Sequence, residues 1–186
     1  SDLSGLQETD RKLGTLLQAF GSREEAARKA VIVVMGDSGV TQLLPRSAGS
    51  AIPLGELLQH YHVLQPGGTV TEDTDIALAL NESMAYVYKL NPNDRLRDIA
   101  NVLQTDNRID FVSWKEKEWI HVLQGGTGEE FQYKANGDVV DPYRQSWTLR
   151  KNAGVFHLQI DGNRLRYTDY PDVLKRLSAA LHSHEE

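Results

Sequence analysis

The first 45 residues combine helical spacing of apolar residues with one continuous apolar run. Apolar residues recur at helical spacing up to Gly21, which ends the pattern. Ser22 and Glu25 have the spacing of a capping box and predict a second helix over about residues 23–29. Residues 31–35 are apolar and mostly β-branched, as is typical of a strand in the middle of a parallel sheet. The apolar positions of the first helix are Leu6, Leu13, Leu16, Leu17 and Phe20.

From residue 46 the pattern changes to short elements separated by turns. Pro53 opens a short helix predicted to run to about Tyr61, and residues 76–80 and 84–90 predict two strands. Asp94 is placed to cap a helix over about residues 95–104. One face of that helix carries Leu96, Ile99, Ala100 and Leu103.

The remaining residues predict antiparallel hairpins followed by a last helix. The triplet Asn136-Gly137-Asp138 has the composition of a tight hairpin turn, and residues 161–163 predict another. The last helix is predicted to begin at Pro171. The strands are predicted over residues 109–114, 118–123, 131–134, 147–150, 155–160 and 165–168.

Together these elements predict two regions with a boundary near residue 45. Residues 1–45 have the order expected of a fragment of an α/β core, in which helices cover a parallel strand. Residues 46–186 are predicted to form an α+β lobe of antiparallel hairpins and short helices. Both ends of the sequence have the look of cuts in a longer chain.

The amino-acid composition limits the classes of protein to which this chain can belong. Of the 186 residues, 40% are hydrophobic and 25% charged, which is ordinary for a globular protein with a packed core. The net charge is −6, and no basic stripe is present, so nucleic acid is not an expected partner. No apolar run approaches the ~20 residues of a membrane span, so no membrane association is expected. The absence of cysteine excludes thiolate chemistry and fits a cytoplasmic location.

The candidate chemistry lies in the turn that follows the predicted buried strand. In an open parallel sheet, ligands bind at the carboxyl ends of the strands, where Asp37 would lie. Flanking glycines, Gly36 and Gly39, allow a sharp turn that brings the carboxylate to the surface. Asp37 is therefore a candidate metal ligand. The alternative is a structural turn in which its carboxylate accepts hydrogen bonds from backbone N–H groups.

These segments resemble the alkaline phosphatase superfamily. The similarity rests on residues 10–17, which read Asp-Arg-Lys-Leu-Gly-Thr-Leu-Leu, and on residues 31–39. It is closest to the type I phosphodiesterase and nucleotide pyrophosphatase group and related bacterial phosphatases. The resemblance covers about residues 2–44 and implies a metal-dependent hydrolase of phosphate esters, with Asp37 as a ligand of one of two metals.

The match departs from the family at Ser38. The family turn usually reads Ser-Asp-His-Gly, and its histidine also binds metal, whereas Ser38 offers only a hydroxyl. Zinc prefers nitrogen and sulfur ligands, while manganese accepts oxygen more readily. The resemblance thus implies zinc or manganese in a longer parent protein, with Ser38 at most a weak contributor. The family's nucleophile and other metal ligands have no counterpart in this sequence, so this chain alone is not expected to be active or to hold metal.

Other candidates have structural alternatives. The pairs His60/His62 and His182/His184 lack a third metal ligand nearby. The glycine-rich residues 125–128 precede a strand-like segment and predict a hairpin loop, because a phosphate cradle needs a following helix. Asp10 is expected to be a solvated helix residue. The aromatic residues are expected to form core or cross-strand pairs, and the alternative is an aromatic platform for a ligand. They are Trp114, Trp119, Trp147, Tyr86, Tyr88 and Tyr133.

Two hypotheses of different class therefore remain. In the first, the chain is a fragment of a metal-dependent phosphodiesterase or phosphatase that acts on a phosphate-ester substrate. In the second, it is a non-catalytic α+β binding or interaction module, a pseudoenzyme whose metal site is degraded at Ser38. In a fragment, the first strand would be left unpaired by the missing sheet, and this exposed edge is expected to permit a dimer that results from the cut.

Overall fold

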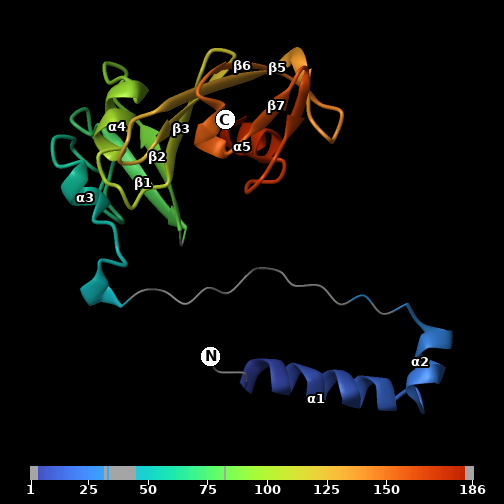
Figure 1. Cartoon of the computed structure of the whole chain (residues 1–186). Coiled ribbons are helices and arrows are strands. Elements are labelled where there is room, and N and C mark those ends of the chain that lie inside the picture. Colours follow the sequence, from blue (N-terminus) through green and yellow to red (C-terminus); the bar gives the residue numbers. More distant parts are fainter. Residues whose placement is uncertain (1–3, 32, 34–44, 82, 183–186) are drawn as a thin grey trace. The chain divides into compact units, whose positions relative to one another are not determined.

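The structure is a computed structural model that describes residues 4–31, 33, 45–81 and 83–182 (Figure 1). It contains two compact units, Ser1–Ala48 and Gly49–Glu186, which we call unit 1 and unit 2. In the part of the chain that the structure describes, the class is mixed α/β. None of the described helices is long and apolar enough to cross a membrane.

Unit 1 contains the two helices that the sequence predicts. Helix α1 spans Ser4–Gln18 and helix α2 spans Arg23–Lys29, followed at the end of the unit by a short 3-10 helix, Arg46–Ala48. The Ser22 hydroxyl accepts a hydrogen bond from the backbone N–H of Glu25 at 3.1 Å, which confirms the predicted helix cap.

The predicted buried strand is not found at the two of its residues that the structure describes. Val31 and Val33 lie in no strand and are 92% and 69% exposed. A strand can be buried on both faces only where neighbouring strands and covering helices surround it. Within the described residues of unit 1, no strand is present to pair with it. The other residues of this segment, including Asp37 and Ser38, lie outside the described residues.

Unit 2 begins with a small helical and hairpin subdomain. Strands β1 (Ile76–Asn81) and β2 (Met84–Lys89) pair antiparallel, and helices α3 (Leu54–Leu57) and α4 (Leu96–Leu103) pack beside them. Buried Leu58, Ile76, Ile99 and Leu103 form their common core. The hairpin and the apolar face of α4 were predicted, but α3 is shorter than expected. The predicted cap is wrong, because α4 begins one residue later and Arg95, not Asp94, precedes its first turn.

The rest of unit 2 is a mixed sheet with the strand order β3-β4-β5-β8-β7, in which β6 pairs with β5. All pairs are antiparallel except β5 and β8, which meet in parallel at Val140 and Arg164. The sequence did not predict this parallel contact. The remaining elements are β3 (Phe111–Glu116), β4 (Trp119–Gln124), β5 (Glu130–Val140), β6 (Ser146–Lys151), 3-10 helix η2 (Ala153–Phe156), β7 (Gln159–Asp161), β8 (Arg164–Arg166) and α5 (Val173–His182).

The hairpin turn predicted at Asn136-Gly137-Asp138 is wrong. Strand β5 continues through these residues and changes register with β6 between Ala135 and Val139, which is a β-bulge. A Cβ atom on Gly137 would lie 2.2 Å from backbone atoms of Trp147 and Thr148. The glycine therefore permits close approach of two strands, a role that its composition cannot distinguish from that of a turn residue. The strand predicted over residues 155–160 is likewise replaced by η2 and the short β7.

The sheet has two different faces. On one face, α5 covers a core that includes Val122, Phe131, Tyr133 and Leu174, and the Tyr133 hydroxyl donates to the Leu174 carbonyl at 3.1 Å. On the opposite face, α4 covers only a small apolar cluster, Ala100, Trp114 and Leu123. Figure 1 shows α5 and α4 against different parts of this region. The part of the second face beyond α4 carries polar side chains.

Candidate functional site

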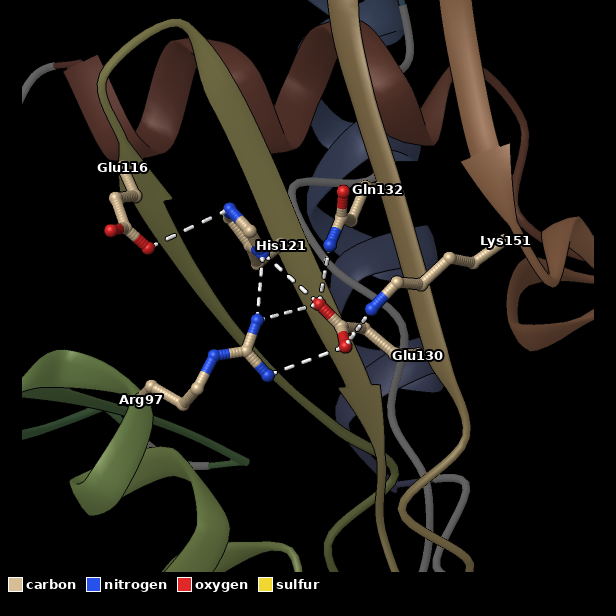
Figure 2. Close-up of polar contacts among 6 residues, drawn as sticks. All are labelled: Arg97, Glu116, His121, Glu130, Gln132 and Lys151. Atoms are coloured by element: carbon tan, nitrogen blue, oxygen red, sulfur yellow. Dashed lines mark hydrogen bonds and ion pairs between the residues drawn. The ribbon is translucent and has the colours of Figure 1, made fainter.

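A cluster of charged side chains lies on this second face, beside α4 (Figure 2). Glu130 is at its centre, at the start of β5, and four side chains contact its carboxylate, three from other elements and one from β5. Arg97 comes from α4, His121 from β4, Lys151 from the end of β6 and Gln132 from β5 itself. We call this set the Glu130 cluster.

Both carboxylate oxygens of Glu130 are engaged. Oε1 accepts from Arg97 Nη2 at 2.8 Å and from Gln132 Nε2 at 2.6 Å, and it lies 3.1 Å from His121 Nδ1. Oε2 accepts from Arg97 Nη1 at 3.3 Å and from Lys151 Nζ. Arg97 thus makes a two-pronged contact, the geometry that its planar guanidinium favours for a carboxylate.

Strand geometry explains why these residues meet. In the register of β4 and β5, His121 lies opposite Gln132, and Glu130 lies two residues away on the same face of β5. Lys151 is the last residue of β6 and has a positive φ of 63°, a conformation unusual for a residue other than glycine. Its ammonium group reaches the Glu130 carboxylate from the strand end.

The electrostatics follow from partial burial. Burial by itself raises the pKa of Glu130, but the hydrogen bonds from Arg97, Lys151, Gln132 and His121 outweigh it, so the pKa lies far below its usual range. The same contact with Glu130 raises the pKa of Arg97. Glu130 is therefore a fixed anion, with its side chain only 12% exposed.

An aromatic ring closes one side of the cluster. The indole of Trp114 stacks on the His121 imidazole, and the guanidinium of Arg97 lies 5.2 Å from the Trp114 ring centroid. Trp114 is buried, and its Nε1 has no hydrogen-bond acceptor in the described part of the chain. On the other side of His121, Glu116 Oε2 lies 3.8 Å from Nε2.

A second aromatic residue on this face carries two more cations. The guanidinium of Arg150 lies 3.9 Å from the Trp119 ring centroid, and Lys134 Nζ lies 5.0 Å from it. Lys134 also donates to Glu118 Oε1 at 2.7 Å. Arg150 is exposed and forms no ion pair with any described residue of the chain. The Trp119 site, defined as Trp119, Arg150 and Lys134, thus differs from the Glu130 cluster in having a cation without a carboxylate.

The two sites offer different chemistry. The Glu130 carboxylate accepts from several donors and is unsuited to act as a base, because its conjugate acid is too strong near neutral pH. Among the described residues, no group of three or more histidine, aspartate or glutamate side chains is arranged to hold a metal. In the Glu130 cluster the carboxylate holds Arg97 and Lys151 in place, whereas among the described cations of this face Arg150 is the one without an ion pair.

The residues singled out from sequence lie elsewhere. Asp37, Ser38 and His184 lie outside the described residues. His62 Nδ1 lies 3.3 Å from Asp75, and His182 Nδ1 lies 2.6 Å from the Ser178 carbonyl oxygen. Asp10 is exposed on α1, as expected. Within the described chain, neither His62 nor His182 belongs to a group of three or more residues that could hold a metal ion.

The glycine-rich residues 125–128 form the loop between β4 and β5, as predicted. The backbone N–H of Gly125 donates to the Asp110 carbonyl at 3.0 Å, and that of Gly126 donates to the Gln104 carbonyl at 2.7 Å. Because these N–H groups point at protein carbonyls, the loop does not form a phosphate cradle.

Sequence reasoning missed the Glu130 cluster and treated the tryptophans only as packing residues. The three charged members and His121 come from positions spread between residues 97 and 151, and no local motif joins them. Alternation along the strands was a usable signal. His121 and Gln132 each lie between two apolar residues that face the core, and Glu130 is two residues before Gln132 on the same face. Of the aromatic set, Trp114, Trp147 and Tyr133 are buried, as expected of core residues.

Comparison with models of known protein families, with curated proteins and with solved structures finds no match to this chain.

Proposed function

We propose that this chain is part of a metal-dependent hydrolase of phosphate esters, in which unit 1 carries the metal ligand Asp37. The observation that carries the proposal is helix α1, because it contains residues 10–17, on which the resemblance to the alkaline phosphatase superfamily rests in part. The buried strand that the resemblance also implies is not found at Val31 or Val33. Residues 49–186 form a separate compact unit, which agrees with a lobe attached to such a core.

In this proposal each residue has a limited role. The Asp37 carboxylate would bind one divalent metal, and the Ser38 hydroxyl would favour manganese over zinc because it offers oxygen and not imidazole. Bound metals in such sites activate a hydroxyl nucleophile and neutralise charge on the phosphoryl group. The nucleophile and the remaining ligands would come from parts of a longer parent protein. Cytoplasmic location and dimerisation through a strand edge stay predictions.

The test compares this chain with the protein encoded by the complete reading frame of its gene. Hydrolysis of a generic phosphodiester is measured with manganese and with zinc, before and after Asp37→Ala. We expect activity only in the longer protein, and a loss of at least about 100-fold on Asp37→Ala, as for removal of a metal-site group. Asp10→Ala is the matched control, because Asp10 is an exposed helix residue of the same unit. Activity that is unchanged by Asp37→Ala would contradict the proposal.

A second candidate function is a non-catalytic binding module. It is favoured by unit 2, where a compact core supports an ordered cationic face and the Glu130 carboxylate is fully engaged. This candidate predicts that Asp37→Asn leaves every binding property unchanged. Metal-dependent hydrolysis lost on that substitution would argue against it.

A further inference from the structure

The Trp119 site holds an arginine whose orientation is fixed but whose charge is unmatched. Arg150 stacks over the Trp119 ring at 3.9 Å from the centroid. Stacking uses the flat face of a guanidinium and leaves its N–H groups at the rim, where they remain available as donors. The platform therefore limits the rotamers of an exposed side chain without consuming its hydrogen-bonding capacity.

The charges on this face do not balance. Four cations lie on it, Arg97, Lys134, Arg150 and Lys151, against the carboxylates Glu116, Glu118 and Glu130. Glu130 is shared by Arg97 and Lys151, and Glu118 is taken by Lys134. The remaining carboxylate, Glu116, lies near His121 Nε2. Arg150 is thus the cation for which the described part of the chain supplies no anion.

The surroundings of Arg150 suit a small oxyanion. Lys134, on the same aromatic ring, adds an ammonium group that pairs with Glu118 at 2.7 Å, and its side chain is 25% exposed. In the register of β5 and β6, Arg150 lies opposite Gln132 and Lys134 lies opposite Thr148. The face therefore places a planar fork, an ammonium and neutral hydrogen-bonding side chains on neighbouring strand positions, which is a combination that recognises phosphate or carboxylate oxygens.

We propose that Arg150, held on Trp119 beside Lys134, binds the phosphate group of an external ligand. Phosphate is favoured over carboxylate because its three oxygens, with up to two negative charges at neutral pH, can accept from the Arg150 fork and from the N–H donors that Lys134 keeps beside its bond to Glu118. The inference stands on unit 2 alone and does not rest on the proposed hydrolase function. An alternative role is purely structural: Arg150 and Lys151 lie on β6, an edge strand among the described residues, and charged residues protect such edges from aggregation.

The probe is inorganic phosphate, added to the whole chain in the presence of a metal chelator at constant ionic strength. The readout is the NMR shift of the Trp119 indole N–H, assigned by its absence in Trp119→Phe. We expect a saturable shift, and we expect Arg150→Gln to weaken phosphate binding about tenfold or more. Arg150→Lys should lose most of the same binding, because the ammonium keeps the charge but lacks the planar fork.

Controls separate the outcomes. Arg166→Gln removes an exposed strand arginine with no aromatic ring beneath it in the described structure, and should leave the affinity unchanged. Acetate at equal ionic strength should produce a much smaller shift. No saturable shift, or equal phosphate affinity in wild type and Arg150→Gln, would overturn the proposal and leave the structural role. Because the chelator removes metal, failure of this test leaves the Asp37 proposal standing, and failure of that proposal leaves this one standing.

Discussion

The imidazole of His121 lies nearly parallel to the indole of Trp114, with ring centroids 4.9 Å apart and an interplanar angle of 14°. The stack joins the apolar cluster under α4 to the Glu130 cluster, because Trp114 belongs to the first and His121 contacts the second. The polar contacts of Glu130 are thus built against packed side chains. Their loss is expected to affect folding stability as well as surface charge.

Glu130→Gln should lower the free energy of unfolding by about 2 kcal/mol at pH 7, because it leaves Arg97 and Lys151 without their shared anion. The pKa of Glu130 is depressed in the folded state, so its contribution is fully present above the unfolded-state pKa of about 4.5 and is lost as pH falls toward the folded-state value. Chemical denaturation from pH 7 to pH 3 should therefore show the two proteins converging in acid. A stability difference that stays constant with pH would contradict this assignment.

Trp147→Phe should destabilise the protein by about 2 kcal/mol more than Trp114→Phe, given the usual value of a hydrogen bond to a charged group. Both indoles are buried, at 4% and 5% exposure. Trp147 Nε1 donates to the buried Asp141 carboxylate at 3.0 Å, whereas Trp114 Nε1 has no acceptor among the described residues. The two positions therefore match in burial and in the substitution made, and they differ in the Asp141 bond. A phenyl ring at position 114 can keep a stack on His121 and a contact with Arg97. Urea denaturation of both variants measures it, and equal losses would show that the Asp141 contact adds nothing.

Gly125→Ala should cost at least about 3 kcal/mol of unfolding free energy, as expected for overpacking against backbone. A Cβ atom at this position would lie 1.6 Å from the carbonyl oxygen of Ile109, and backbone cannot move aside as a flexible side chain can. Gly55→Ala is the control, because no atom lies within 4 Å of its added Cβ. Thermal unfolding compares the two variants. Similar melting temperatures would mean that the loop between β4 and β5 adapts to the added methyl group.

Tyr170 should lose its proton at a higher pH than an ordinary tyrosine. Its hydroxyl donates to Asp110 Oδ2 at 2.6 Å, and this bond, followed by burial, raises the pKa of Tyr170 to about 12. The associated stability is fully present below the unfolded pKa of about 10 and is lost as pH rises through about 12. The measurement is a pH titration followed by phenolate absorbance. The difference between the wild-type and Tyr170→Phe titrations gives the ionisation of Tyr170. Asp110→Asn should lower the pKa toward 10, Asp73→Asn should not, and an unchanged pKa in Asp110→Asn would refute the Asp110 bond as the cause.

Local rules predicted the helices and most strands of this chain well. Ser22 caps α2, the apolar face of α4 is buried, and the β1–β2 hairpin occurs where two apolar segments flank residues 81–83. Each of these features is determined within a few residues along the chain. The Asn136–Asp138 segment failed because turn residues also suit a bulge, and only the approach of β6 to Gly137 decides between the two.

The candidate sites depend on contacts across long stretches of sequence. Arg97 and Glu130 are 33 residues apart, and Arg150 meets Trp119 from a strand that is not adjacent to β4. No periodicity indicates which cation receives a carboxylate and which does not. Asp37 was the most conspicuous residue in the sequence because the turn predicted there rests on neighbouring residues, whereas the unmatched charge of Arg150 becomes visible only once the sheet is assembled.

Strand β5 serves two groups of partners at once. Its first half pairs with β4, its last residue pairs with β8, and β6 follows it on both sides of the bulge. Residues 111–151 can therefore pair through short connections, whereas η2 and β7 separate β6 from β8, which lies parallel to β5. During synthesis, strands β3 to β6 should be able to pair before β8 and α5 have left the ribosome. The end of β5 would then already be in place when β8 emerges and pairs with it.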